Sequence, residues 1–315
     1  MILTVTLHTA LDKVIFIDEW TPGLPMRTNR VLTCVGGKGL DSSIVLSQMG
    51  VATSGLCFVA GKTGADLIDL VHTYGAATLP IWVNGETRTA HVIVETRHNR
   101  HSHLITGALE IAPSHWQQLL DAFDRNVPLA DWVICAGSLP ANMPDDFFAT
   151  LTHHAHSVSV PILIDSSTHG IRSALPARPD ILKMNRDEFS EAFGTRASSL
   201  EELVTQAQSA RRQFDLPALV ITCGVDGILA FTSEESIHAA APPQQAVNAA
   251  GAGDAASAAL AWRRSLGEDW QQALRWAAAV SAAAVLTEGT AEIRQRDVHD
   301  ILPQVLVRRI STNSP

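Results

Sequence analysis

The sequence has few cysteines, few lysines and no long apolar run, and each shortage excludes a class of protein. Its four cysteines lie far apart and form no CxxC pair, so neither a zinc ribbon nor a disulfide framework is indicated. The longest apolar run, residues 276–286, has 11 residues, about half of the roughly 20 that a membrane helix needs. A basic leader followed by an apolar core is also missing from the N-terminal segment. We therefore expect a cytoplasmic protein without a membrane partner.

Positive charge is scarce as well. Among 315 residues there are 23 basic and 32 acidic side chains, which gives a net charge of −9 and excludes the broad basic surface of a nucleic-acid-binding protein. Only four of the basic residues are lysines: Lys13, Lys38, Lys62 and Lys183. Any anionic ligand must therefore be held by local positive groups.

Apolar residues make up 46% of the chain, enough for a sizeable core, and their pattern alternates between two types of element. Short β-branched runs predict strands at 2–6, 53–59, 131–136, 161–165, 180–183, 218–222 and 227–231. Amphipathic patterns predict helices at 38–49, 64–74, 114–125, 145–156, 186–193, 200–213, 254–265 and 269–286. This alternation indicates an α/β fold with a mostly parallel central sheet.

Two stretches, residues 13–35 and 79–107, interrupt the alternation. The segments VIFIDEW, RVLTCV, LPIWV, TAHVIVET and HSHLIT read as strands with no helix between them. We interpret them as a small β-sheet lid inserted into a single domain that spans residues 1–315, placed where ligands bind in open α/β sheets. A plain surface hairpin is the alternative.

The strongest chemical signal is the run from Asn248 to Asp254, NAAGAGD, which precedes an alanine-rich helix. Its glycines expose backbone amides, and the helix start directs further N–H groups to the same place, which favours an anion site at Gly251, Ala252 and Gly253. A carboxylate beside such a site could accept a proton from a hydroxyl during phosphoryl transfer. A purely structural helix cap is the other interpretation of Asp254.

Other glycine-rich turns carry less information on their own. The turn GGKGL at 36–40 opens a helix and allows a ligand to approach the backbone. The run Gly61-Lys62-Thr63 resembles the end of a phosphate-binding P-loop, but five residues separate Gly61 from the preceding Gly55, where that motif has four. No GxGxxG follows the first strand, which argues against a nicotinamide enzyme.

In their order along the chain, seven motifs resemble those of the ribokinase-like sugar kinases of the phosphofructokinase B type, in particular the 1-phosphofructokinase and tagatose-6-phosphate kinase branch. The motifs are TLHTALD (6–12), GGKGL (36–40), GETR (85–88), AGSLP (136–140), LKMNRDE (182–188), TCGVDG (222–227) and NAAGAGDA (248–255). The resemblance implies a three-layer αβα sandwich with a β lid. It also implies an ATP-dependent sugar-phosphate kinase that uses Mg²⁺ and acts on a phosphorylated ketohexose such as fructose 1-phosphate, fructose 6-phosphate or tagatose 6-phosphate.

The resemblance further implies a role for each matching position. Asp254 would be the general base, and Gly251, Ala252 and Gly253 would form the anion hole. The substrate would be held by Asp12, Arg27, Gly36, Gly37, Lys38, Asp41, Arg88 and Ser138. The nucleotide would be held by Lys183, Asn185, Glu188, Thr222, Gly224 and Gly227, with Mg²⁺ reached through water from Asn185 and Glu188. A homodimer through the lid would match the family.

The chain departs from the pattern of this branch on the sugar side. It has His8 and Thr9 where Asn and Pro are usual, and Asp41 where Asn is usual. A carboxylate accepts hydrogen bonds but cannot donate as an amide does, and it repels a nearby phosphate. These changes leave the identity of the sugar undecided. Two alternative functions also stay open: a kinase of an unphosphorylated sugar or nucleoside, and a catalytically silent sugar-phosphate-binding protein.

Overall fold

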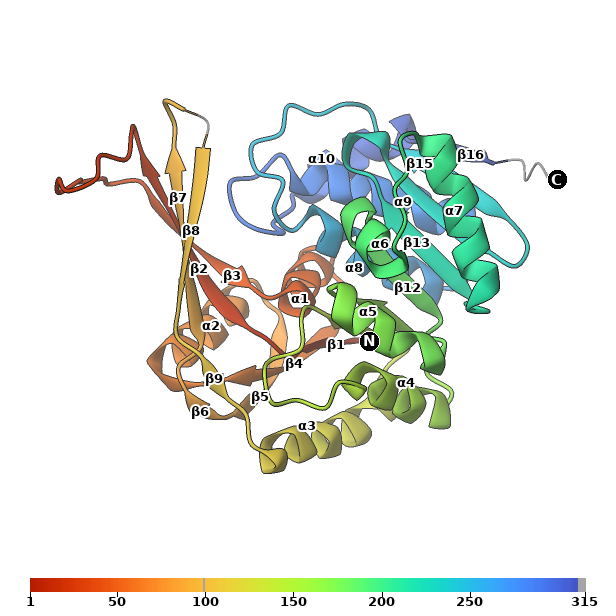
Figure 1. The fold of residues 1–315 in the computed structure, drawn as a ribbon, viewed down its shortest axis with the longest axis horizontal. Coiled ribbons are helices and arrows are strands. Elements are labelled where there is room, and N and C mark those ends of the chain that lie inside the picture. The colour runs from red at the N-terminus through yellow and green to blue at the C-terminus, as the bar shows by residue number, and fades with distance from the viewer. Residues whose placement is uncertain (99, 311–315) are drawn as a thin grey trace.

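A large twisted sheet crosses the main body of the protein in the computed structural model, which describes residues 1–98 and 100–310 (Figure 1). Within these residues the sheet has ten strands. From one edge to the other they are β16 (Leu306–Arg309), β15 (Ser236–Ala240), β14 (Ile228–Thr232), β13 (Ala218–Thr222), β12 (Ile181–Asn185), β11 (Ile162–Asp165), β10 (Trp132–Ala136), β1 (Ile2–Thr6), β4 (Thr53–Val59) and β5 (Ala77–Trp82). Strands β13 to β5 are parallel, whereas β14, β15 and β16 are antiparallel.

Helices cover both faces of this sheet because its strands are apolar on both sides. In β1, Leu3 and Val5 contribute to one core and Ile2 to the other, as the alternation of strand side chains requires. One face is covered by α3 (Pro113–Asn126), α4 (Phe147–Ser157), α5 (Thr168–Ala174), α6 (Arg186–Phe193) and α7 (Leu200–Gln213). The other face is covered by α1 (Lys38–Gln48), α2 (Gly61–Thr73), α8 (Ala252–Ser265), α9 (Trp270–Ala284) and α10 (Gln295–Ile301). The expected three-layer αβα sandwich is confirmed.

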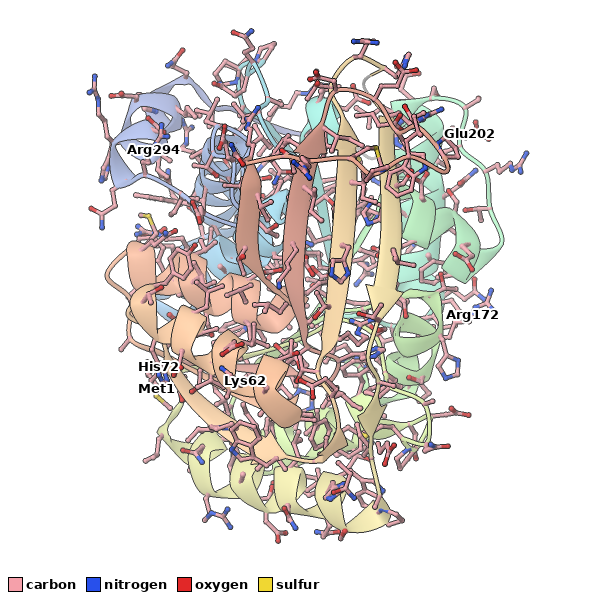
Figure 2. The ribbon with its side chains drawn as sticks, turned by 90° about the vertical axis from the view of Figure 1, so that its left-hand side faces the viewer. Met1, Lys62, His72, Arg172, Glu202 and Arg294 are labelled. Carbon is pink, nitrogen blue, oxygen red and sulfur yellow. The ribbon has the colours of Figure 1, made fainter. Side chains whose placement is uncertain are left out.

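A second, four-stranded sheet stands beside the main body and faces the viewer in Figure 2. Its order is β3 (Val31–Gly36), β2 (Ala10–Ile17), β7 (Arg88–Glu95) and β8 (Arg100–Thr106). Below it, β6 (Asn84–Gly85) and β9 (Leu109–Glu110) form a two-stranded ladder. We refer to the four-stranded sheet as the lid.

The expected boundary of the lid is wrong at one point. The segment LPIWV, residues 79–83, does not join the lid, because Leu79 to Trp82 belong to β5 at the edge of the main sheet. The reason is packing, since Leu79 and Ile81 lie against the core shared with α3. Helices α5 and α10, the short strands β6 and β9, strand β15 and the edge strand β16 were not predicted.

The topology gathers polar loops at one edge of the main sheet. Parallel strands β1, β10, β11, β12 and β13 all end at this edge, where ligands bind in open α/β sheets. Within the described part of the chain, none of the helices has the length and apolar character needed to cross a membrane.

Candidate active site

A cavity of about 340 Å³ opens at this edge of the sheet. Its walls come from α1, β11, β12, α6, the loop after β13, and the start of α8. They comprise Lys38, Asp165, Lys183, Asn185, Glu188, Thr222, Gly224, Gly227, Ile228, Ala252, Gly253, Asp254 and Ser281. The structure thus brings together all the predicted nucleotide-binding residues, Lys38, and the predicted catalytic residues from Ala252 to Asp254.

The N-terminus of α8 supplies the anion-binding part of this cavity. Gly251 precedes the helix with φ 80°, and a Cβ placed on it would lie 2.3 Å from the backbone nitrogen of Ala291, so only glycine fits. Within the described residues, the N–H groups of Gly253 and Asp254 have no backbone acceptor, and that of Ala252 reaches only the carbonyl of Ala249, at 3.4 Å. These N–H groups can therefore bind a negatively charged ligand.

Two lysines converge on Asp165, a residue that the sequence analysis did not single out. Lys183 Nζ lies 2.5 Å from Asp165 Oδ2, and Lys38 Nζ lies 3.0 Å from Oδ1. Ser257 of α8 also donates a hydrogen bond to Oδ2, at 2.8 Å. Burial alone would raise the pKa of this carboxyl, but the two lysines outweigh burial and hold its pKa well below the ordinary value. Asp165 therefore stays ionised and fixes both ammonium groups at the cavity.

Lys183 is held where it can also reach the start of α8. A Cβ placed on Gly253 would lie 3.5 Å from Lys183 Nζ, so the ammonium group adjoins the glycine turn. Its side chain is only 2% exposed. A positive charge and unpaired N–H groups thus meet at one place, as the stabilisation of a transferred phosphoryl group requires.

Asp254 lies in the first turn of α8 and is 7% exposed. Burial is the main reason why its pKa rises to about 7, and the charge of Asp165 adds to the rise, while Lys38 and Lys183 oppose it. The Asp254 backbone carbonyl accepts a hydrogen bond from Ser42 of α1, which ties the two helices together. A carboxyl with a pKa near neutrality can both accept and release a proton at physiological pH.

Asn185 and Glu188 form a reciprocal cap at the start of α6. The Asn185 side chain accepts from the Glu188 N–H, and the Glu188 carboxylate accepts from the Asn185 N–H, both at 2.8 Å. The second carboxylate oxygen of Glu188 lies 3.2 Å from Lys38 Nζ. The Asn185 amide and Glu188 carboxylate carry oxygen atoms, the ligand type that Mg²⁺ takes directly or through the waters it keeps.

The predicted sugar-binding residues form a second group, at the base of the lid. A Cβ on Gly36 would lie 2.6 Å from Asp12 Oδ1, and one on Gly37 would lie 2.8 Å from Thr6 Cγ2, so both glycines make room for neighbouring side chains. Burial raises the pKa of Asp12 to about 6, against the opposing charge of Arg88. Arg88 itself donates to the carbonyl of His8, at 3.1 Å.

The three positions that depart from the family pattern lie in this second group or against it. His8 Nδ1 lies 3.1 Å from Ser138 Oγ, and burial, aided by Arg88, lowers the pKa of His8 to about 4. Thr9 is buried and donates to the carbonyl of Phe58, so it has a structural role. Asp41 is 3% exposed, its Oδ1 has no hydrogen-bond partner in the described structure, and burial, with Asp254 and Asp12, raises its pKa.

Two basic residues do not join either group. Arg27 is exposed in the loop that joins β2 to β3, residues 18–30, which projects from the lid on the side away from the main body (Figure 1). Its proposed contact with substrate phosphate stays a prediction. Lys62, from the run that imitates a P-loop, is on the outer surface of α2, where it pairs with Asp66 (Figure 2).

The chain is similar in sequence and in fold to known proteins. A model of the pfkB family of carbohydrate kinases matches residues 4–296. The chain is 28% identical to a 1-phosphofructokinase of Bacillus subtilis over 98% of this chain and 100% of the relative. It is 26% identical to a D-tagatose-1-phosphate kinase of Bacillus licheniformis over 94% and 96% of the two chains. The fold is shared with phosphofructokinase-2 from Escherichia coli, with a TM-score of 0.86 at 21% identity over 96% and 98% of the chains.

Proposed function

The chain belongs to the pfkB family of carbohydrate kinases, and from this premise we propose that it transfers the γ-phosphoryl group of ATP to a hydroxyl of a phosphorylated ketohexose. It is an ATP-dependent carbohydrate kinase of the phosphofructokinase type. The two relatives are named 1-phosphofructokinase and D-tagatose-1-phosphate kinase. For this chain, the proposed acceptors are fructose 1-phosphate, fructose 6-phosphate and tagatose 6-phosphate.

The observation that carries the proposal is the position of Asp254. Asp254 lines the same cavity as Lys38 and Lys183, and it follows Gly253, whose N–H group has no backbone acceptor within the described residues. A protein that only bound a sugar phosphate would have no need of a near-neutral carboxyl beside an anion hole. This arrangement supports catalysis over the silent-binding alternative.

The reaction assigns one task to each group. The sugar hydroxyl oxygen forms a bond to the γ-phosphorus while the bond between that phosphorus and the ADP oxygen breaks. Asp254 takes the hydroxyl proton, and Lys183 and the N–H groups of Ala252 and Gly253 stabilise the negative charge on the phosphoryl oxygens. The lid would exclude water that could otherwise accept the phosphoryl group.

The nucleotide would occupy the part of the cavity between the capping pair of α6 and the loop of residues 222–227. Asn185 and Glu188 would hold Mg²⁺ through its waters. When bound, Mg²⁺ neutralises charge on the ATP phosphates. Lys38 and Lys183 would bring the only lysine charges to the cavity within the described residues, which fits the scarcity of lysine in the chain.

Arg88 supports a phosphorylated acceptor. It is half-buried, lies close enough to Asp12 to affect its pKa, and makes only backbone hydrogen bonds within the described residues. An arginine without a paired carboxylate is suited to bind phosphate. The kinase of an unphosphorylated sugar is the alternative that this observation disfavours.

A coupled ADP-release assay tests the proposal. The panel would contain fructose 1-phosphate, fructose 6-phosphate, tagatose 1-phosphate, tagatose 6-phosphate and free fructose, with Asp254→Asn as the control. We expect turnover with at least one phosphate ester and little with fructose. Equal rates for the variant and the wild type would remove Asp254 from its role, and thermal stabilisation by sugar phosphates without ATP turnover would favour the silent-binding alternative.

We also propose that two copies of the chain associate through their lids. Apolar side chains are exposed on both outer strands of the lid: Val31 of β3 is 48% exposed, and Leu104 and Ile105 of β8 are 60% and 55% exposed. Light scattering should give a dimer for the wild type and a monomer for the double variant Leu104→Glu, Ile105→Glu. Leu129→Glu, at an exposed position outside the lid, should remain dimeric. A monomeric wild type would refute this association.

A further inference from the structure

The loop of residues 222–227 is held from behind by the antiparallel end of the main sheet. Thr222, Gly224 and Gly227 of this loop line the cavity. A Cβ placed on Gly227, whose φ is 90°, would lie 2.2 Å from the carbonyl oxygen of Ala239 in β15. The loop therefore touches β15 directly, and β16 lies next to β15 at the edge of the sheet (Figure 1).

His238 of β15 connects this sheet edge to the loop. Its side chain is buried, with Nε2 2.6 Å from the backbone carbonyl oxygen of Asp226. Its other ring nitrogen, Nδ1, lies 3.2 Å from Nε of Arg308, the residue directly opposite in β16. Neither His238 nor Arg308 lines the cavity.

The arginine determines which imidazole nitrogen carries the proton. A guanidinium group can only donate, so Nδ1 of His238 must accept. The proton of the neutral ring is then on Nε2, which donates to the Asp226 carbonyl. Arg308 thus selects the one neutral tautomer that can hold the loop.

The side chain of Asp226 is held from a different element. Its Oδ2 accepts from the guanidinium of Arg186, the first residue of α6, at 3.0 Å. The backbone of the loop is closed by three hydrogen bonds: from the Cys223 N–H to the Gly227 carbonyl, from the Asp226 N–H to the Cys223 carbonyl, and from the Gly227 N–H to the Gly224 carbonyl. His238 therefore fixes the main chain of a loop whose side-chain anchor is on α6.

We propose that His238, in the tautomer selected by Arg308, is a positioning residue that holds the loop of residues 222–227 in the conformation that binds ATP. The inference rests on the proposed function for the identity of the nucleotide. A loop ordered before binding loses less conformational entropy when the ligand arrives, so its fixation raises affinity. Because the loop does not include the groups that act on the transferred phosphoryl, the effect falls on ATP binding and leaves the chemical step nearly unchanged.

The test compares three variants with the full-length wild type. His238→Phe removes both hydrogen bonds, His238→Gln keeps an N–H donor for the Asp226 carbonyl, and Arg308→Met removes only the selection of the tautomer. His153→Phe, at an exposed histidine of α4, is the matched control. KM for ATP, KM for the sugar phosphate, kcat, and hydrogen exchange of the Asp226 and Gly227 amides are measured for each.

For His238→Phe we expect KM for ATP to rise about tenfold, equivalent to about 1.4 kcal/mol. Its kcat and its KM for the sugar phosphate should stay within about twofold of the wild type. The two loop amides should exchange faster, His238→Gln should recover most of the affinity, and Arg308→Met should lie between the two.

Three outcomes overturn the inference. The first is a folded His238→Phe variant with an unchanged KM for ATP and unchanged hydrogen exchange of the two loop amides. The second is a His238→Phe variant in which kcat and both KM values worsen equally. The third is an equal effect of the control substitution His153→Phe. If His238→Phe does not fold, Arg308→Met decides, and a wild-type KM for ATP in that variant would refute the role. A wild type without ATP turnover would instead refute the proposed function, and faster exchange of the loop amides would still support the contact.

Discussion

Replacing Asp254 with asparagine should weaken catalysis and, at the same time, stabilise the folded protein. Burial, followed by the charge of Asp165, raises the pKa of this carboxyl from its ordinary value of 3.8 to about 7. The folded protein therefore binds the proton more tightly than the unfolded chain does. The free energy of unfolding consequently falls as pH rises from about 4 to about 7, and the cost of the buried charge is complete above that range.

The size of the stabilisation follows from the same pKa values. A rise from 3.8 to about 7 corresponds to an upper limit of about 4 kcal/mol above pH 7. Since asparagine still buries a polar group, we expect a gain of about 2 to 3 kcal/mol at pH 8 and a smaller gain at pH 5. Loss of a general base should lower kcat by about 10² to 10⁴-fold.

Urea unfolding at both pH values and the coupled kinase assay measure the two effects. Asp121→Asn in α3, which replaces an exposed carboxylate outside the cavity, should change neither quantity. In the wild type, kcat should rise as pH passes about 7, because the ionised form of Asp254 would act as the proposed base. A variant with wild-type kcat, or one that is less stable than the wild type at pH 8, would refute the reasoning.

Three further substitutions test other parts of the site. Asp165→Asn leaves Lys183, 2% exposed, as a buried charge without its partner, so the free energy of unfolding measured in urea should fall by about 3 to 5 kcal/mol. A fall of less than about 1 kcal/mol would contradict the importance of this buried ion pair. Asp41→Asn removes a buried carboxylate from the sugar side and should lower KM for the sugar phosphate severalfold in the coupled assay. An unchanged KM would show that the Asp41 carboxylate does not weaken sugar-phosphate binding. Gly251 has φ 80°, and Gly251→Ala forces a methyl group against the Ala291 backbone, so the melting temperature and kcat should both fall. Wild-type values of both would show that the turn can relax.

The sequence predicted the main elements well where periodicity was strong. Seven predicted strands and eight predicted helices match elements of the structure within a few residues. Strand β15 and the edge strand β16 were missed because they have only five and four residues, with one β-branched residue in each. The segment LPIWV was placed in the wrong sheet because a strand pattern does not specify its partner.

The candidate site was predictable only where its residues lie in local motifs. The glycine turn before α8 and the motif LKMNRDE, residues 182–188, are local, and both lie in the structure at the start of a predicted helix. Asp165 was missed because a single aspartate at the end of ILID has no local signature. Its importance arises from Lys38, 127 residues away, and from Ser257, 92 residues away.

These separations along the chain have a consequence for folding kinetics. The hydrogen bond from Ser42 to the Asp254 carbonyl closes a separation of 212 residues, and the contact of Lys38 with Asp165 closes one of 127. Each closure has an entropic cost that local contacts do not have, so contacts of this kind form after the strands and helices have assembled. We therefore expect a refolding chain to recover far-UV circular dichroism before it recovers nucleotide binding. Ligand binding in the cavity would then report completion of the native state more faithfully than secondary structure does.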